Sequence, residues 1–160
     1  YQVSLDQIQV VKRLKGPMPR FYANVGELRE VFLNLFLNAA QAIGRKGTIE
    51  ISGKYSGDDQ IFEFRISDTG AGIPEANLSK LFHPFFTTRP EGVGLGLFVT
   101  QQIVHGYNGS IRAESYPGKG TAFIIELPLS VEPNTANPSM PEAPKSLFSP
   151  HVEKVEKLTS

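Results

Sequence analysis

Two asparagines lie within a strongly apolar stretch of the chain, EVFLNLFLNAAQAI over residues 30–43. The spacing of its Val, Phe, Leu, Ala and Ile residues predicts a helix that is buried on most of its sides. An amide in such a helix costs stability unless a partner satisfies it. The amide oxygens of Asn34 and Asn38 are hard ligands of the kind that Mg²⁺ accepts beside waters and phosphate oxygens. The pair therefore points to a site on this helix.

The two asparagines belong to a polar stripe that runs along the predicted helix. Glu30, Asn34, Asn38 and Gln41 fall at positions i, i+4, i+8 and i+11, which share one helical face. The stripe could be a solvent-facing edge, but short amides are poorer helix formers than the Lys or Glu that usually serve there. We therefore interpret it as the polar wall of a pocket.

Asp68 is the second polar residue in an apolar pattern. It continues the alternation of Phe62, Phe64 and Ile66, so it is expected to face the core. A carboxylate there needs a partner, and no basic residue lies nearby in the sequence. Asp68 either caps the following loop or accepts from an N–H donor of a ligand. Thr121 alternates in the same way with the apolar residues that follow it, so its hydroxyl also faces inward.

Three irregular segments complete the set of candidate functional residues. In TGAGIP, Gly70 and Gly72 let the backbone turn and approach a ligand closely. The segment GVGLGL over residues 92–97 opens a predicted helix, where free backbone N–H groups favour anions. Its spacing is not that of a Walker loop, so alone it is a weak signal. The stretch LFHPFFTTRPE before it is either a surface loop over a satellite core or a lid.

These features together describe a nucleotide pocket. The amide stripe offers Mg²⁺ ligands, the inward carboxylate accepts from a base, and the glycine-rich helix start receives phosphates. The carboxylate suits the exocyclic amine of adenine. Guanine also offers an N–H donor, so these residues narrow the ligand without fixing it.

The elements that position these residues alternate between strands and helices. Asn24, with Glu27 three residues later, is a capping-box variant that starts the first helix, and Gly44 is expected to end it. The complete predicted order is strand 7–14, a short strand 21–23, helix 24–43, strands 48–55 and 61–68, a short helix 75–81, helix 95–105, and strands 110–116 and 121–127. This order predicts an α+β fold in which helices cover one face of a sheet.

Composition bounds the remaining possibilities. The chain has 160 residues, with 16 Lys plus Arg against 16 Asp plus Glu, so bulk charge gives no support for a nucleic-acid or membrane-surface role. It has no cysteine, and its three histidines lack zinc-ligand spacing. After Leu129 the chain becomes rich in Pro, Ser and Asn. We therefore expect one domain over residues 1–130 and a linker or disordered tail over 131–160, which should be dispensable for stability.

Four segments resemble, in order, the sequence boxes of the catalytic ATP-binding domain of sensor histidine kinases. NLFLNAAQAI looks like the N box, DTGAGIP the G1 box, LFHPFFTT the F box and GVGLGL the G2 box, while GKGTAFIIELP matches the closing strands. The resemblance covers roughly residues 5–129, and ordered boxes agree by chance far less often than one motif. It implies a two-layer α/β sandwich of the Bergerat type, with a mixed, mostly antiparallel sheet on about three helices.

The resemblance also implies roles for individual residues. Asn38 is expected to coordinate Mg²⁺ with Asn34 assisting, Asp68 to accept from the adenine amine, and Thr121 to support the base. Arg89 is the expected phosphate contact of a short lid, from Phe86 to Gly92, similar to that of nitrogen-regulation sensor kinases. The other expected ATP contacts are Gln41, Gly70, Gly72, Ile73, Phe82, Thr87, Thr88, Gly92, Gly94, Leu95, Gly96 and Leu97.

Some positions depart from the family pattern. Arg89 stands where short-lid relatives usually have Lys, and a guanidinium is not equivalent to an ammonium. His83, Val93 and Asn24 replace an acidic residue, a Thr and an Asp. Asn34 is the most informative position. Gyrase-type, mismatch-repair and chaperone ATPases resemble one another in having a Glu base there, and an amide cannot take a proton.

The implied function is transfer of the ATP γ-phosphoryl group to a histidine on a separate dimerisation domain, in two-component signalling. The partners would be that histidine-containing domain, outside this chain, and a response regulator receiver domain, without direct nucleic-acid contact. We expect a cytoplasmic piece of a longer protein, with any membrane contact made only through that parent. Two alternatives remain: a conformational ATPase of the gyrase or chaperone kind, and a degenerate module that senses nucleotide without transfer.

Overall fold

The computed structural model describes residues 7–14, 23–56, 60–90 and 92–129. This part of the chain forms five strands and three helices. Their order is β1 (Ile8–Leu14), α1 (Val25–Ile43), β2 (Gly47–Ser56), β3 (Ile61–Asp68), α2 (Glu75–Leu78), α3 (Gly96–Gly106), β4 (Ser110–Tyr116) and β5 (Gly120–Pro128). Most of the strand predicted over 21–23, and the whole predicted tail over 131–160, lie outside the described residues.

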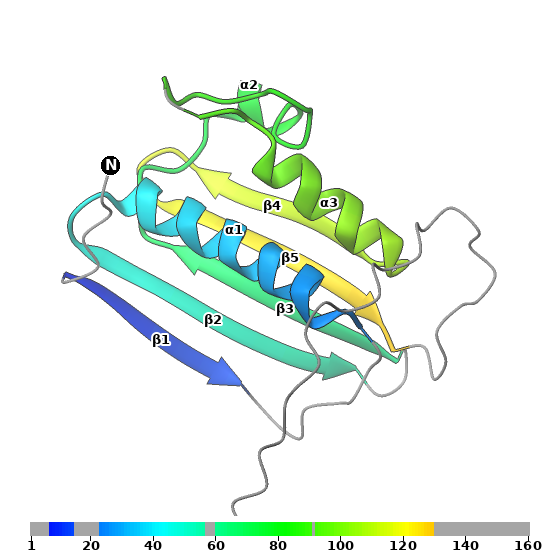
Figure 1. Cartoon of the computed structure of the whole chain (residues 1–160). Coiled ribbons are helices and arrows are strands. Elements are labelled where there is room, and N and C mark those ends of the chain that lie inside the picture. The colour runs from blue at the N-terminus through cyan, green and yellow to red at the C-terminus, as the bar shows by residue number, and fades with distance from the viewer. Residues whose placement is uncertain (1–6, 15–22, 57–59, 91, 130–160) are drawn as a thin grey trace, which may run out of the picture.

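The strands form one mixed sheet in the order β1-β2-β3-β5-β4 (Figure 1). Only the pairing of β1 with β2 is parallel, because α1 connects them as a crossover and returns the chain to the same end of the sheet. The antiparallel register opposes Ile49 to Asp68 and Ser115 to Thr121. The inward-facing polar residues at the end of β3 and the start of β5 therefore lie at one end of the sheet.

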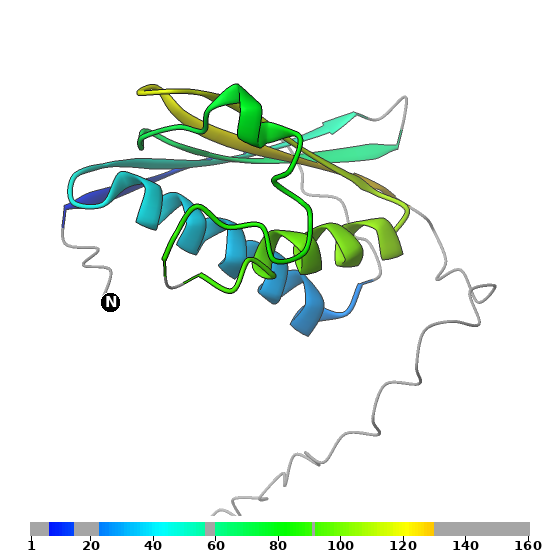
Figure 2. The same ribbon diagram turned by 90° about the horizontal axis from the view of Figure 1, so that it is seen from above.

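The core lies between the sheet and the pair α1 and α3, which occupy one side of it (Figure 2). The buried residues of α1 are Val31, Leu35, Ala39 and Ala40, which follow helical spacing. They meet the inward residues of the strands, such as Ile66 of β3. The predicted α+β class, with helices on one sheet face, is confirmed.

The start of α1 is capped as predicted, but the second half of the capping box is replaced. Asn24 Oδ1 accepts from Gly26 N at 2.8 Å. The Glu27 side chain does not reach back to Asn24 N. Instead Asn24 N donates to the Tyr107 hydroxyl at 2.9 Å, and that hydroxyl donates to Glu27. Tyr107 thus joins the end of α3 to the start of α1, and burial together with Glu27 raises its pKa.

The short helix is the element whose length was predicted wrongly. It was expected over 75–81, but α2 ends at Leu78. After it the backbone makes tighter bonds, from Lys80 N to Asn77 O and from Leu81 N to Leu78 O. These contacts close turns across three residues rather than four, so the chain bends toward α3 instead of extending the helix.

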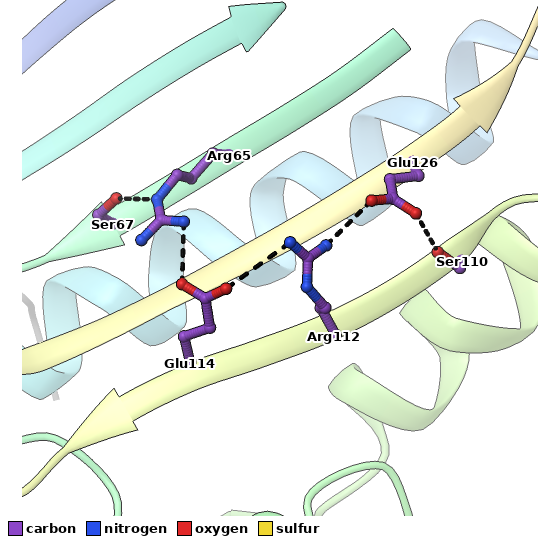
Figure 3. A network of polar contacts seen from close by, with 6 residues as sticks. All are labelled: Arg65, Ser67, Ser110, Arg112, Glu114 and Glu126. Atoms are coloured by element: carbon purple, nitrogen blue, oxygen red, sulfur yellow. Dashed lines mark hydrogen bonds and ion pairs between the residues drawn. The ribbon is translucent and has the colours of Figure 1, made fainter. Parts of the chain in front are cut away.

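The open face of the sheet carries a chain of alternating charges (Figure 3). Consecutive contacts of 3.0–3.6 Å join its members in the order Ser67, Arg65, Glu114, Arg112, Glu126 and Ser110. Ile124 lies on this face directly opposite Arg65 and Arg112, yet it is fully buried. Within the described part of the chain, the aliphatic stems of the two arginines therefore cover it.

Removing one of these stems should cost more stability than removing its charge. We expect Arg112→Ala to lower the free energy of unfolding by about 1 kcal/mol more than Arg112→Met, which keeps a stem over Ile124. Exposed ion pairs of this kind contribute little on their own. Chemical denaturation of both variants beside wild type is the measurement. Equal losses would mean that the ion pairs, and not the stem, stabilise this face.

Candidate functional site

A cavity of about 250 Å³ opens between α1, the end of β3, the start of β5 and the segment that leads into α3. Most of the predicted site residues line it: Asn38, Asp68, Ile73, Thr87, Thr88, Arg89, Gly92, Gly94, Gly96, Leu97 and Thr121. The structure therefore brings the four boxes together around one space. The cavity has two chemically different ends.

One end is built from Asp68 and Thr121, which are 6% and 4% exposed. Asp68 Oδ1 accepts from Gly70 N at 2.8 Å and from Thr121 N at 3.3 Å. The partner that the sequence could not supply is thus the backbone, and the loop-capping interpretation of Asp68 is correct as far as this oxygen is concerned. The other carboxylate oxygen, Oδ2, is then available to a ligand in the cavity. The ligand-binding interpretation of Asp68 therefore stays a prediction.

Burial raises the pKa of Asp68 above its ordinary value near 3.8, and the N–H groups of Gly70 and Thr121 oppose that rise. Desolvation is the largest cause, because it disfavours the charged form. A carboxylate held in this way gains from any additional donor that enters the cavity.

Backbone contacts fix the shape of this end. Gly72 has φ +72°, and a Cβ there would overlap the carbonyl of Tyr116. Gly120 has φ +90°, and a Cβ there would overlap the carbonyl oxygen of Asp68. Only glycine combines this conformation with so close an approach. Gly72 is therefore a packing residue of the loop; it is not among the described residues that line the cavity.

The other end carries the amides of α1 and one cation. Arg89 Nη1 donates to Asn38 Oδ1 at 3.2 Å and also contacts Gln41 Oε1, while Nη2 lies 3.4 Å from the Asn38 carbonyl. Although Arg89 is exposed as a whole residue, partial burial of its guanidinium lowers its pKa. The group stays charged at neutral pH, as guanidinium groups do in proteins. Gln41 thus contacts Arg89, which lines the cavity, but does not line the cavity itself.

Asn34 faces a different partner from Asn38. Its Nδ2 donates to Gly96 O at 3.3 Å and lies 3.5 Å from the hydroxyl of Thr100, which is fully buried. The amide nitrogen must be the atom that faces Gly96, because a carbonyl can only accept. Asn34 therefore fastens α1 to the first turn of α3. Its assistance in metal binding stays a prediction.

The protein groups at this end suit a metal ion that is coordinated mainly by waters and phosphate oxygens. The described residues hold no group of three or more His, Cys, Asp or Glu side chains that could bind a metal ion. What they offer is neutral amide oxygen, at Asn38 and Gln41. Mg²⁺ commonly keeps waters and substrate phosphates and takes few protein ligands, so this set fits it. Arg89 holds both oxygens here, and two cations repel at such distances, so a metal at Asn38 requires the guanidinium to move.

The start of α3 faces the same end of the cavity. Leu95 occupies the N-cap position without a side-chain cap, and Gly96 and Leu97 line the cavity. The first backbone N–H groups of a helix have no partner within it and attract anions. Gly94, at φ +72°, packs against the backbone of Phe85 and Phe86 and leads the chain into this turn.

Sequence reasoning missed four cavity residues: Ala42, Leu81, Phe86 and Phe123. A helical repeat from Asn38 would have found Ala42, and a strand repeat from Thr121 would have found Phe123. In the other direction, four predicted contacts besides Asn34 and Gly72 do not line it. Gln41 contacts Arg89, Gly70 lies against the carbonyl of Ala42, Phe82 packs on the core, and Leu95 caps α3.

Comparison with known proteins agrees with this geometry. Residues 23–131 match the family described as histidine kinase-, DNA gyrase B-, and HSP90-like ATPase. The chain belongs to this family. Within the family it groups with the sensor histidine kinases, as the boxes predicted. The sensor histidine kinase ZraS of Salmonella typhimurium is 42% identical over 123 residues, which cover 77% of this chain and 26% of ZraS.

Solved histidine kinases share the fold of this ATPase-family domain. The catalytic domain of histidine kinase ThkA aligns with a TM-score of 0.68 and 31% identity, over 76% of this chain and 79% of that one. Full-length ShkA, solved in complex with AMPPNP, aligns with a TM-score of 0.69 and 26% identity, over 77% and 26% of the two chains.

The chain spans about a quarter of the length of the ZraS proteins that it matches. The described part of the chain includes no helix with the length and apolar content that crossing a membrane requires.

Proposed function

We propose that this domain binds Mg²⁺-ATP and transfers the γ-phosphoryl group to a histidine of a separate helical dimerisation domain. The adenine would lie against Asp68 and Thr121, and the phosphates would lie between Asn38, Arg89 and the start of α3. ATP is the nucleotide that the family description and the AMPPNP complex of ShkA favour.

The opposite polarity of the two cavity ends is the observation that carries this proposal. At one end, the buried residues Asp68 and Thr121 line the space. At the other end, Arg89 lines it together with Gly96 and Leu97 of the first turn of α3, whose N–H groups have no partner within the helix. A base with an exocyclic amine joined to a chain of phosphates matches both ends at once. A neutral metabolite or an all-cationic ligand would match only one end of the cavity.

Asn38 would contribute the protein's oxygen to Mg²⁺, with Gln41 nearby once Arg89 turns toward phosphate. The metal, when bound, neutralises phosphate charge during transfer. The residues of this chain then hold the nucleotide, exclude water through residues 81–90 and 92–95, and present the terminal phosphate. At the phosphate end, the described lining residues include no carboxylate or imidazole that could activate water, and Asn34 donates to Gly96 O of α3 through an amide, which is not a base.

This absence of a base at the phosphate end of the described site favours transfer to an imidazole over hydrolysis. A neutral histidine is already nucleophilic, whereas water and serine need a proton acceptor. The partners follow from the relatives named sensor histidine kinase. We propose a histidine-bearing dimerisation domain of the parent protein and, beyond it, a response regulator.

The decisive experiment mixes the full chain with the dimerisation domain of its parent protein and γ-labelled ATP. The expected product is acid-labile, base-stable phosphate on the dimerisation domain, formed only when Mg²⁺ is present. Release of inorganic phosphate without labelling would identify a conformational ATPase instead. Binding of ATP with neither product would identify a nucleotide-sensing module.

A further inference from the structure

Ser115 lies behind the base end of the cavity and makes three polar contacts there. It is on β4, it is buried, and it is not among the described residues that line the cavity. Its hydroxyl accepts from Ile73 N at 2.8 Å, donates to Gly120 O at 2.9 Å, and lies 2.8 Å from Thr121 Oγ1. The side chain thus joins the G1 loop to both strands of the β4–β5 hairpin.

A count of hydrogens suggests the direction of the third contact. A serine hydroxyl has one hydrogen, and Ser115 places it on the carbonyl of Gly120. By geometry either hydroxyl could donate in the 2.8 Å contact between them; with the Ser115 hydrogen on Gly120 O, we assign Thr121 as the donor. Its single hydrogen points at Ser115 and away from the cavity. What Thr121 offers to a ligand is then a pair of acceptor lone pairs.

Asp68, like Thr121, presents a hydrogen-bond acceptor to the cavity. Its Oδ1 is occupied by two backbone N–H groups, so Oδ2 is the oxygen available at the cavity. An ionised carboxylate can only accept. Both polar groups at this end are therefore acceptors, and a base that presents another acceptor there meets no donor.

We propose that Ser115 is a positioning residue that sets the purine selectivity of this domain through the hydroxyl of Thr121. By holding that hydroxyl as an acceptor, Ser115 selects a base with an amine at the six position and disfavours one with an oxygen there. The proposal rests on the proposed nucleotide function of the cavity. It assigns to Ser115 an effect that a residue merely supporting the loop at Ile73 would not have.

ATP and ITP are the probes, because hypoxanthine carries an acceptor oxygen in place of adenine's six-position amine and a hydrogen on N1, where adenine has an acceptor. We would titrate both into the full chain as wild type, Ser115→Ala, Thr121→Val and the double variant. Wild type is expected to prefer ATP. Ser115→Ala frees the Thr121 hydroxyl to turn and donate, so the ratio of the two dissociation constants should narrow about tenfold.

The double variant separates the two possible roles of Ser115. If Ser115 acts through Thr121, then Ser115→Ala changes the ATP-to-ITP ratio in the wild-type background and not in the Thr121→Val background. Ser110→Ala is the matched control, because Ser110 is on the same strand but bonds Glu126 on the open face. It should leave the ratio unchanged.

An unchanged ratio in folded Ser115→Ala would overturn the proposal, as would an equal narrowing in both backgrounds or a wild type that does not prefer ATP. Circular dichroism and thermal unfolding check that each variant folds. If Ser115→Ala does not fold, Ser115→Cys carries the same comparison, because a thiol is a weak hydrogen-bonding group. A wild type that binds neither nucleotide would instead contradict the proposed function.

Discussion

Asn38→Ala is expected to lower phosphoryl transfer to the dimerisation domain by roughly 100-fold or more, while the domain stays folded. The substitution removes the oxygen that would bind Mg²⁺, and the charge stabilisation that the metal supplies is worth several kcal/mol in the transition state. Asn38→Asp should also fail, because it adds a negative charge beside the phosphates. Phosphohistidine formation at saturating ATP is the measurement.

Two neighbours on α1 provide controls for this result. Gln41→Ala removes another partner of Arg89 but leaves Asn38 in place, so it should retain most of the transfer activity. Asn34→Glu should weaken transfer for a different reason: a carboxylate cannot donate to Gly96 O, so the first turn of α3 loses its fastening. The new carboxylate could also orient water, so slow phosphate release should be assayed. If Asn38→Ala transfers phosphate at the wild-type rate, the assignment of Mg²⁺ binding to Asn38 is wrong.

Asp68→Asn is expected to weaken ATP binding by about 10- to 100-fold without weakening the fold. The asparagine oxygen can still accept from the N–H groups of Gly70 and Thr121, so the strand end keeps its hydrogen bonds. The amide nitrogen, however, replaces the oxygen that faces the cavity. A donor then meets the adenine amine, and an unpaired buried group costs about 1–3 kcal/mol. Calorimetric titration with a non-hydrolysable ATP analogue measures this loss.

The same variant should change how stability depends on pH. The folded-state pKa of Asp68 is raised, so the ionised carboxylate costs folding free energy at every pH above its unfolded value near 3.8. That cost shrinks as the pH falls through the folded pKa, and it is gone below the unfolded value. Asp68→Asn should therefore melt at or above the wild-type temperature at neutral pH, and the difference should shrink toward about pH 4. Glu114→Gln, on the open sheet face, is the control. A variant much less stable at neutral pH would contradict the assigned hydrogen bonds.

Local patterns in the sequence were sufficient to predict most of the fold. Strand alternation placed Asp68 and Thr121 inward, and both are buried. Helical spacing and the cap at Asn24 located α1 within one residue. The length of α2 could not be read in this way, because its end is decided by a change to three-residue turns that bring the chain back to α3.

Contacts between distant segments set the limit of the sequence prediction for the site. The position of Ser115 behind Thr121 depends on the register of β4 against β5, and the bridge of Tyr107 to Asn24 spans 83 residues. Neither residue breaks the local pattern around it, so neither attracts notice in the sequence. Asn34 and Asn38 look equivalent on a helical wheel, yet one bonds α3 and the other bonds Arg89.

The close backbone packing at Gly72 and Gly120 has a kinetic consequence. These contacts leave the base end of the cavity no room to relax, so it is preformed and a base can enter it on first encounter. At the other end, Arg89 must release Asn38 and Gln41 before phosphate and metal can take their places. Nucleotide association should then occur in two steps. The first is a fast bimolecular step in which the base enters its end of the cavity. The second is slower and does not depend on nucleotide concentration, because its rate is that at which Arg89 leaves the amides and binds phosphate.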